Sequence, residues 1–240
     1  MGKDKYRRFQ ENLTFANMVQ PDFEEVFGKE YRLKGHWHDE FFRNLELGCG
    51  RGEYTVALAE RNPDRNYIGI DIKGARMWRG AKTATERGMA NAAFLRTRIE
   101  FINSFFASGE VDEIWITFPD PQLKKQRVKK RLTSPQFLGY YAKFLKPDGV
   151  VHLKTDSRHL HEYTKAVIER NALPLLACGD DIYGTGMADT DLSIQTAYER
   201  KFREQGLPIT YLRFMLGGRS EFEAPDFEED DNLDASRLGE

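Results

Sequence analysis

The stretch that decides the fold is LELGCGRGEY, from Leu45 to Tyr54. It places three glycines within five positions, after an apolar run and before a helical pattern. Because glycine has no Cβ and adopts positive φ, such a turn lets a nucleotide-like ligand approach the backbone closely. The stretch therefore predicts a ligand site between a first strand and the helix that follows it.

Apolar runs alternate with helical patterns on both sides of this turn. Strands are expected at 44–47, 66–71, 92–96, 111–118, 150–155, 173–178 and 209–215, and helices at 53–61, 73–87, 99–107, 134–145, 157–171 and 196–205, with a turn at 146–149. Strand–helix alternation of this kind predicts one doubly wound α/β domain, whose parallel sheet is covered on both faces. Ligands of such sheets bind at the carboxyl ends of the strands, where the strand order reverses.

Composition is ordinary for a soluble globular protein, with 40% apolar and 31% charged residues in a chain of 240. No apolar run approaches the ~18 residues of a membrane span, and the charged start MGKDKYRRFQ does not resemble a signal peptide. Cys49 and Cys178 have no paired spacing for zinc or a disulfide framework. We therefore expect a cytoplasmic protein.

The charged residues are unevenly distributed along the chain. Residues 221–240 hold nine acids and one base, which gives −8; since the whole chain carries −2, the first 220 residues carry +6. We expect an N-terminal extension at 1–40, a catalytic domain at 41–218 and an acidic, disordered tail at 219–240. The tail could also compete with an acidic partner for a basic site on the domain.

The glycines alone do not identify the ligand. Their G-x-G-x-G spacing is one residue shorter than the dinucleotide fingerprint, and Asp71, 23 residues after Gly48, stands where an acid can bind ribose hydroxyls. A nicotinamide dinucleotide, or a plain tight turn with Asp71 as a helix cap, would fit this spacing. Glu46 disfavours the dinucleotide, because an acid beside the glycines repels a pyrophosphate and attracts a cationic ligand with an amino group.

Glu46, the glycines and Asp71 together resemble the S-adenosylmethionine site of the seven-stranded, Rossmann-like methyltransferases. The resemblance extends over residues 44–215. It implies a mostly parallel sheet with an antiparallel last strand, and S-adenosyl-L-methionine as the cofactor. In that family the glycine turn lies against the methionine part of the cofactor, and the acid after the second strand binds its ribose.

The fourth predicted strand ends in Phe118-Pro119-Asp120-Pro121, and a basic segment follows. Two prolines that flank an acid fix φ on both sides of it and so orient the carboxylate. Six of the ten residues from Gln122 to Arg131 are basic. A solvated loop can have this composition, but beside an oriented acid and in a positively charged domain it favours a nucleic-acid substrate.

These motifs resemble one family in particular, the bacterial tRNA (guanine-N7-)-methyltransferases. That family has F-P-D-P before a Lys/Arg-rich segment, a Thr-Asp pair after the fifth strand, here Thr155-Asp156, and T-x-Y-E before a helix, here Thr196-Ala197-Tyr198-Glu199. The resemblance implies methylation of N7 of guanosine 46 in the variable loop of tRNA.

The resemblance also implies roles for particular residues. Asp120 would be catalytic; the cofactor would be bound by Glu46, Gly48, Gly50, Asp71, Arg98 and Asp120, and tRNA by Lys124, Asp156, Thr196, Ala197, Tyr198 and Glu199. Two departures matter. Arg98 stands where many members have Asp or Asn, so its contact could be through the backbone alone. Gln122-Leu123 replaces a frequent Trp-Pro or Trp-His, which leaves the local contact with guanine open.

Other functions remain to be distinguished. A methyltransferase for rRNA, protein or a small molecule would share the cofactor half of the site, and an RNA-binding protein without catalysis would share the fold. The two His-x-His pairs, His36/His38 and His159/His161, project their rings apart on a helix, so we expect no metal site. The sequence leaves open whether the protein is a monomer or a homodimer.

Overall fold

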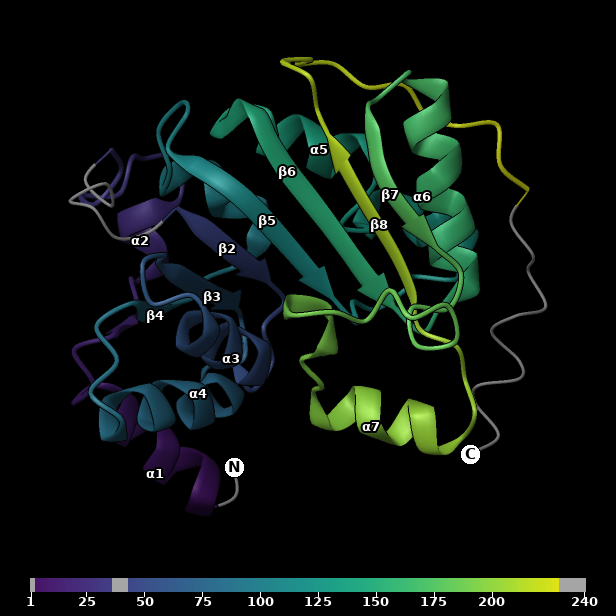
Figure 1. Ribbon diagram of the computed structural model, residues 1–240. Helices are drawn as coiled ribbons and strands as arrows, with labels where there is room; N and C mark the ends of the chain where they lie inside the picture. Colours follow the sequence, from purple (N-terminus) through teal and green to yellow (C-terminus); the bar gives the residue numbers. More distant parts are fainter. Residues whose placement is uncertain (1–2, 36–42, 229–240) are drawn as a thin grey trace.

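The computed structural model describes residues 3–35 and 43–228, and within them eight strands form one sheet (Figure 1). Their order is β1-β4-β3-β2-β5-β6-β8-β7. The strands are β1 (Met18–Val19), β2 (Asn44–Leu47), β3 (Tyr67–Asp71), β4 (Ala92–Arg96), β5 (Val111–Thr117), β6 (Leu145–Thr155), β7 (Leu175–Gly179) and β8 (Thr210–Met215). Neighbours pair in parallel except that β8 is antiparallel to β6 and β7. The predicted mostly parallel sheet with an antiparallel last strand is confirmed.

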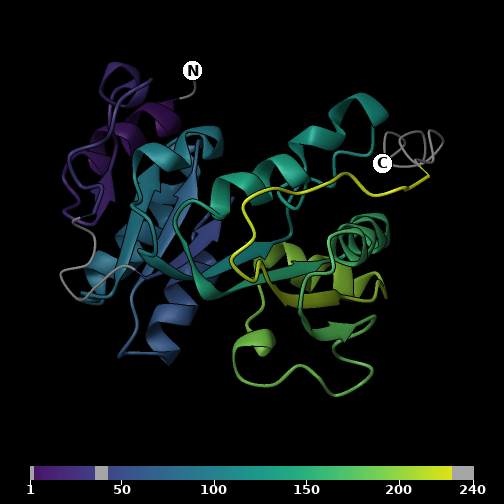
Figure 2. The same ribbon diagram turned by 90° about the horizontal axis from the view of Figure 1, so that it is seen from above.

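Helices cover both faces of the sheet (Figure 2). One face packs against α3 (Glu53–Arg61) and α4 (Gly74–Glu86), and the other against the 3₁₀ helix η1 (Ile99–Ser104), α5 (Pro135–Tyr141) and α6 (Arg158–Arg170). This explains why all four residues of β2 are buried, the polar Asn44 and Glu46 as well as Leu45 and Leu47. A further helix, α7 (Ala197–Glu204), lies beyond the carboxyl ends of β5 and β6 (Figure 1).

Gly52 decides how closely the first two helices approach the sheet. It is the N-cap of α3, with φ of 70°. A Cβ at this position would lie 2.4 Å from the ring of Phe94 and 3.2 Å from the Cα of Gly80 on α4. Because both the backbone conformation and the space exclude a side chain, only glycine allows α3 to begin here, directly after the turn.

The strand order reverses beside β2. From β2 the chain builds outward through β3 and β4, and it then returns to place β5 and β6 on the other side of β2. The crossover connections therefore diverge at the carboxyl ends of β2 and β5, which leaves a crevice there. The glycine turn and the Phe118–Pro121 motif both begin at this crevice.

The N-terminal residues supply an eighth strand, so the expected count of seven is wrong. β1 pairs with β4 at the edge of the sheet, with Met18 opposite Phe94. A two-residue strand has no periodicity of its own, which explains why the sequence pattern missed it. Before it, α1 (Lys3–Asn12) packs on α4, where Glu11 accepts hydrogen bonds from Trp78 Nε1 at 2.8 Å and Lys82 Nζ at 2.9 Å.

Two other elements differ from their predicted form. Residues 99–104 form a 3₁₀ helix rather than an α-helix to 107, because Ile99, Ile102 and Phe105 recur every three residues and pack on one side of it. The helix predicted at 134–145 ends at Tyr141, and β6 already starts at Leu145, which pairs with Val111. The predicted turn at 146–149 is thus an irregularity within a strand pairing.

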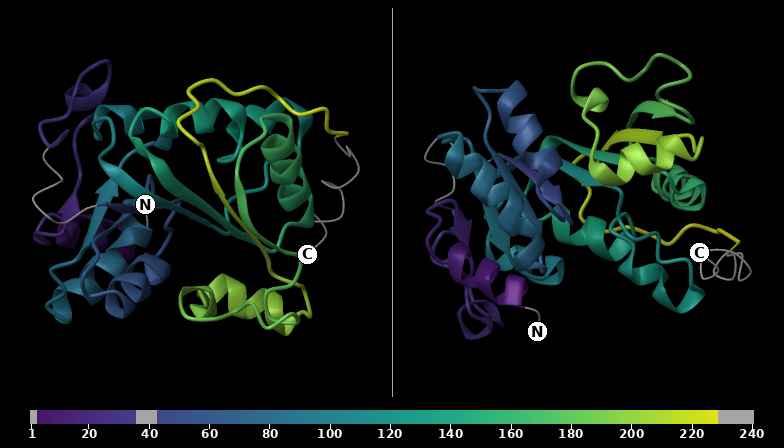
Figure 3. Two further views of the ribbon diagram at one scale, coloured as in Figure 1. Left: turned by 45° about the horizontal axis from the view of Figure 1, so that its top comes forward. Right: turned by 90° about the horizontal axis from the view of Figure 1, so that it is seen from below.

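The segment after β8 runs back across the domain (Figure 3), and its side chains Phe222 and Phe227 pack on the core. Asn171 exchanges two hydrogen bonds with the backbone of Glu223, and Phe227 contacts the rings of His159 and Tyr163 edge-on, at 5.3 and 5.5 Å. Two aromatic side chains of this segment, Phe222 and Phe227, thus pack on the domain, and the disorder expected for the tail at 219–240 stays a prediction. Residues 229–240 lie outside the described residues.

Candidate functional site

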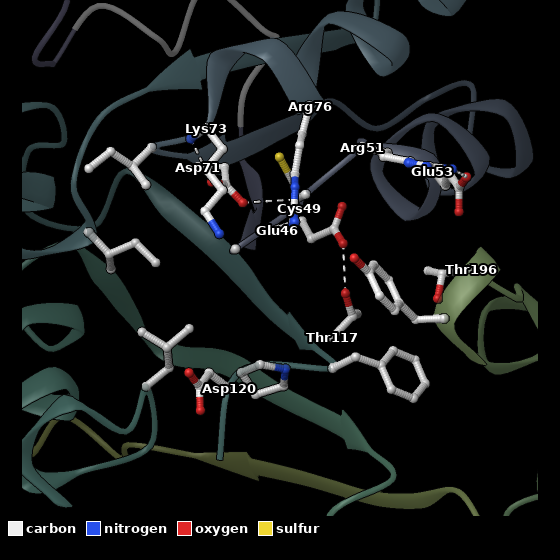
Figure 4. A pocket seen from close by; sticks show the side chains of 18 of the residues that line it. Glu46, Cys49, Arg51, Glu53, Asp71, Lys73, Arg76, Thr117, Asp120 and Thr196 are labelled. Atoms are coloured by element: carbon white, nitrogen blue, oxygen red, sulfur yellow. Dashed lines mark hydrogen bonds and ion pairs between the residues drawn. The ribbon is translucent and has the colours of Figure 1, made fainter. Parts of the chain in front are cut away.

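A pocket of about 590 Å³ opens at the carboxyl ends of β2, β3, β5 and β6 (Figure 4). Its volume is typical of small-molecule sites. Figure 4 shows Asp71 and Asp120 on one side of the view, Thr196 on the other, and Glu46 between them. The residues around it come from the glycine turn, the start of α4, the loop after β5 and the start of α7.

Asp71 joins the glycine turn to the end of β3. Its Oδ2 accepts a hydrogen bond from the backbone N–H of Gly50 at 2.9 Å, and its Oδ1 accepts one from that of Lys73 at 2.7 Å. A carboxylate can accept about four hydrogen bonds. Asp71 therefore holds the turn in place and still has acceptor capacity toward the pocket.

Glu46 lies at the floor of the pocket and is almost completely buried, at 1% exposure. Its Oε1 accepts a hydrogen bond from Thr117 Oγ1 at 2.7 Å, and its Oε2 accepts one from Thr55. Burial raises the pKa of Glu46 to about 7, and the charge of Asp71 acts in the same direction. A cation close to such a buried acid favours its ionised form.

The loop after β5 has an unusual backbone. Phe118 and Gln122, on either side of Pro119-Asp120-Pro121, have φ values of 48° and 49°. Positive φ is strained for side chains of this size, and backbone strain of this kind clusters at functional sites. The Asp120 side chain is exposed, and its Oδ1 accepts a hydrogen bond from the N–H of Gln122 at 3.0 Å. The strained loop thus presents this carboxylate to the pocket.

Arg131 holds the loop from behind. It is fully buried, and its Nε and Nη2 donate to the carbonyl oxygens of Pro121 and Gln122, each at 3.1 Å. Its guanidinium also lies 4.3 Å from the ring centre of Tyr163 and contacts His159 Nε2 at 3.0 Å. Arg131 closes the basic segment, but it faces the interior, unlike the exposed Lys124, Lys125, Arg127, Lys129 and Lys130 around the 3₁₀ helix η2 (Lys125–Lys130).

The start of α7 forms the opposite wall. Thr196 is its N-cap and accepts a hydrogen bond from the N–H of Glu199 at 3.1 Å. Ala197 donates its N–H to Glu53 Oε2 at 2.7 Å, which ties α7 to the start of α3. Tyr198 is 52% exposed and lines the pocket. These contacts fix α7 at the rim, with the tyrosine ring accessible.

Glu199 points the other way, into a buried ion pair with Lys154. The Nζ of Lys154 lies 2.8 Å from Glu199 Oε1 and also donates to the carbonyl oxygens of Leu192 and Ile194 at 2.8 Å. Tyr183 donates its hydroxyl to Glu199 at 2.7 Å. Both charged side chains have no exposed surface, and burial lowers the pKa of Lys154 to about 8. The pair fastens α7 and the loop before it to β6.

The structure brings most of the expected residues together. Those that line the pocket are Glu46, Gly48, Gly50, Asp71, Asp120, Asp156, Thr196 and Tyr198. Four do not line it: Arg98, Lys124, Ala197 and Glu199. The side chain of Arg98 lies 3.7 Å from Glu100, while its neighbour Ile99 lines the pocket, so a backbone contact remains compatible with the fold. The carboxylate of Glu199 is buried and faces Lys154 instead of the pocket, and its expected role toward tRNA stays a prediction.

Other residues line the pocket that the sequence analysis did not single out. Lys73 is the N-cap of α4, Arg76 lies in the first turn of that helix, and Thr117 is the last residue of β5. Their position after strands that lead to the crevice was the signal that could have found them. Phe202 of α7 completes the wall and had no such signal, because its helix follows no strand of the site.

The histidine pairs behave as separate residues where the structure describes them. His159 contacts Arg131, whereas His161 Nε2 lies 3.2 Å from Asp180 Oδ1 and 4.0 Å from Cys178 Sγ. This His161 group lies between α6 and β7, and none of its members lines the pocket. His36 and His38 lie outside the described residues.

The pocket fits S-adenosylmethionine in its donor set. A Cβ on Gly48, where φ is 74°, would meet no protein atom within 4 Å, so the turn leaves open space in front of its backbone. Asp71 offers acceptors suited to ribose hydroxyls, and Glu46 offers a buried anion for the ammonium or sulfonium group. The doubly wound sheet, the glycine turn and these two acids define the class of S-adenosylmethionine-dependent methyltransferases.

Comparisons with known proteins narrow the class. Residues 42–212 match a family described as "Putative methyltransferase". The chain is 53% identical to a tRNA (guanine-N(7)-)-methyltransferase of Christiangramia forsetii, over 89% of this chain and 98% of that protein. It is 48% identical to one of Bacteroides thetaiotaomicron, over 95% and 92% of the two chains. The chain belongs to the tRNA (guanine-N(7)-)-methyltransferase family.

Solved structures agree on the fold. The structure of the 16S rRNA methyltransferase KamB superposes with a TM-score of 0.57, at 15% identity, and covers 80% of this chain and 92% of that one. The predicted methyltransferase fold is thereby confirmed. Membership of the methyltransferase family confirms the predicted cofactor, S-adenosyl-L-methionine. Within the described residues, no helix has the length and apolar character needed to cross a membrane.

Proposed function

We propose that this enzyme transfers a methyl group from S-adenosylmethionine to N7 of guanosine 46 in the variable loop of tRNA, in the cytoplasm. The observation that carries the proposal is the pairing of a buried Glu46 behind the glycine turn with Asp120 on the strained loop opposite, in a chain of this family. Glu46 would bind the cationic cofactor, and Asp120 would face the target base.

The reaction needs no strong base. N7 of guanine carries a lone pair and has no proton to lose, so the protein has to align it with the methyl group, which is catalysis by proximity and orientation. S-adenosylmethionine supplies the methyl group from a sulfonium, and the positive charge ends on the purine. Asp120 and Asp156, both at the pocket, are placed to stabilise that charge.

Each predicted contact then has a proposed task. Glu46, Asp71 and the backbone of Gly48 and Gly50 hold the cofactor, with Arg98 contributing through its backbone. Lys124, Asp156, Thr196 and Tyr198 face the tRNA. Ala197 and Glu199 act through the placement of α7, because one is bonded to Glu53 and the other to Lys154.

Substrate class is tested by methyl transfer from tritiated S-adenosylmethionine to three acceptors at equal concentration: an unmodified tRNA transcript, a 16S rRNA transcript and a histone mixture. We expect tritium in the tRNA alone. Comparable transfer to rRNA or protein, with none to tRNA, would overturn the assignment and favour another methyltransferase activity.

A further inference from the structure

A second hollow adjoins the pocket, between α3, α4 and the start of α7. It has a volume of about 350 Å³ and shares Arg51 and Glu53 with the pocket, so the two lie side by side. Figure 4 shows Arg51 and Glu53 on the side of the pocket that α7 approaches. We call this hollow the arginine groove; its charged residues are Arg51, Glu53, Glu60, Arg79, Arg87 and Arg200.

Four arginines against two glutamates leave the groove positively charged. Arg87 is paired with Glu60 at 3.1 Å, and Glu53 accepts the N–H of Ala197 at 2.7 Å while lying 4.0 Å from Arg51. Within the described residues, no ion pair involves Arg79 or Arg200. Two exposed guanidinium groups are thus available to an anion.

Local contacts hold the helices of Arg79 and Arg200 beside the groove. Arg200 donates Nη1 to the carbonyl oxygen of Gln195 at 2.8 Å, which orients its guanidinium without neutralising it. Arg79 is exposed on α4, one residue before Gly80. A Cβ at Gly80 would lie 2.8 Å from the carbonyl oxygen of Arg51, so α4 lies close against the glycine turn. Both arginines therefore stand on elements fixed to the pocket.

The groove and the basic segment around η2 lie at different walls of one pocket. Lys130 and Gln122 line the pocket from the η2 side, and Arg51 lines it from the side of the groove. A nucleotide within an RNA chain carries a phosphate on both its 5′ and its 3′ side. When such a nucleotide occupies the pocket, the RNA strand leaves the pocket on both its 5′ and its 3′ side. One positively charged wall can bind the phosphates of only one of these two strand segments.

We propose that the arginine groove is a second RNA-binding surface, on which Arg79 and Arg200 bind backbone phosphates of the strand that leaves the target nucleotide away from η2. This inference rests on the proposed function, since it requires RNA in the pocket. Arginine suits the task because its planar guanidinium binds phosphate oxygens in pairs and stays charged. Such contacts position the RNA and do not read its sequence.

The test is the double variant Arg79→Ala/Arg200→Ala, with Lys143→Ala/Arg219→Ala as the matched control. The control removes two exposed charges at the opposite end of the sheet, before β6 and after β8. Binding of an unmodified tRNA transcript is measured by fluorescence anisotropy across a salt series. Thermal unfolding and calorimetry with S-adenosylmethionine check that the fold and cofactor site are intact.

We expect the groove variant to bind tRNA roughly tenfold more weakly and its log–log salt slope to shrink by about 1.4–1.8, at 0.7–0.9 per phosphate contact. Cofactor affinity and the control variant should match wild type. A salt slope equal to that of the control, in a protein whose wild type methylates the same tRNA, overturns the groove alone. A wild type that neither binds nor methylates tRNA overturns the proposed function, and the groove with it.

Discussion

Glu46 should make cofactor binding depend on pH. Its pKa of about 7 in the free protein arises from burial, so below pH 7 it is mostly protonated and neutral. A cationic cofactor that binds beside it favours the ionised form. Binding should therefore release a proton from Glu46, and affinity should rise with pH up to about 7. At or below pH 7 the amino group of the cofactor stays largely protonated, so it does not obscure the effect.

The size of the effect follows from the ionised fraction. With a pKa of about 7, that fraction grows from about 3% at pH 5.5 to about 50% at pH 7, so the dissociation constant for S-adenosylmethionine should fall about fifteenfold. At pH 6 binding should release about 0.9 proton. Because the pKa of Glu46 in the folded protein lies above the ordinary value of 4.5, the free protein should also lose about 3 kcal/mol of stability as pH rises from below 4.5 through 7.

Calorimetry at each pH, in two buffers with different ionisation enthalpies, measures both the affinity and the proton release. The matched variant is Glu46→Gln, which keeps the size of the side chain and cannot ionise. It should bind the cofactor more weakly and show neither the pH dependence nor the proton release. A wild-type protein with no proton release at pH 6, or a Glu46→Gln variant with the same pH profile as wild type, would refute this reasoning.

Three other predictions concern the loop and α7. Asp120→Asn should slow single-turnover methyl transfer by about 10²–10³, while tRNA affinity falls much less. Near-full activity would show that Asp156, and not Asp120, stabilises the positive charge on the purine. Arg131→Met removes the donors to two loop carbonyls, so it should slow transfer and cost about 3 kcal/mol in urea unfolding while S-adenosylmethionine binding persists; unchanged turnover would remove Arg131 from loop positioning. Lys154→Met should cost about 3–5 kcal/mol, because it leaves Glu199 buried without its cation, and Lys154→Met/Glu199→Leu should recover much of that loss; a single-variant cost below ~1 kcal/mol would show that the ion pair does not hold α7.

The sheet was predictable because its strands are apolar runs between turns, and the pattern repeats along the chain. β1 was not, since its two residues gain their strand conformation only from pairing with β4. The end of the helix predicted at 134–145 was missed for a related reason: the pairing of Leu145 with Val111 extends β6 toward the helix.

The sequence predicted which residues lie near the pocket, but it did not always predict the direction in which a side chain points. Arg131 follows five exposed basic side chains and differs from them only by facing inward, which no linear pattern records. Glu199 stands in a motif beside the accessible Tyr198, yet its partner Lys154 is 45 residues away in sequence. Long-range pairing of buried charges decides such cases, and it becomes visible only in the folded chain.

The most direct test of the central claim compares two tRNAs that differ in one atom position. One carries guanosine at position 46, and the other carries 7-deazaguanosine there, which has a carbon in place of N7. With S-adenosylmethionine, the account predicts one equivalent of N7-methylguanosine in the first tRNA by nucleoside mass spectrometry, and no methylation of the second. Equal methylation of both tRNAs, or a different methylated nucleoside in the first, would contradict it.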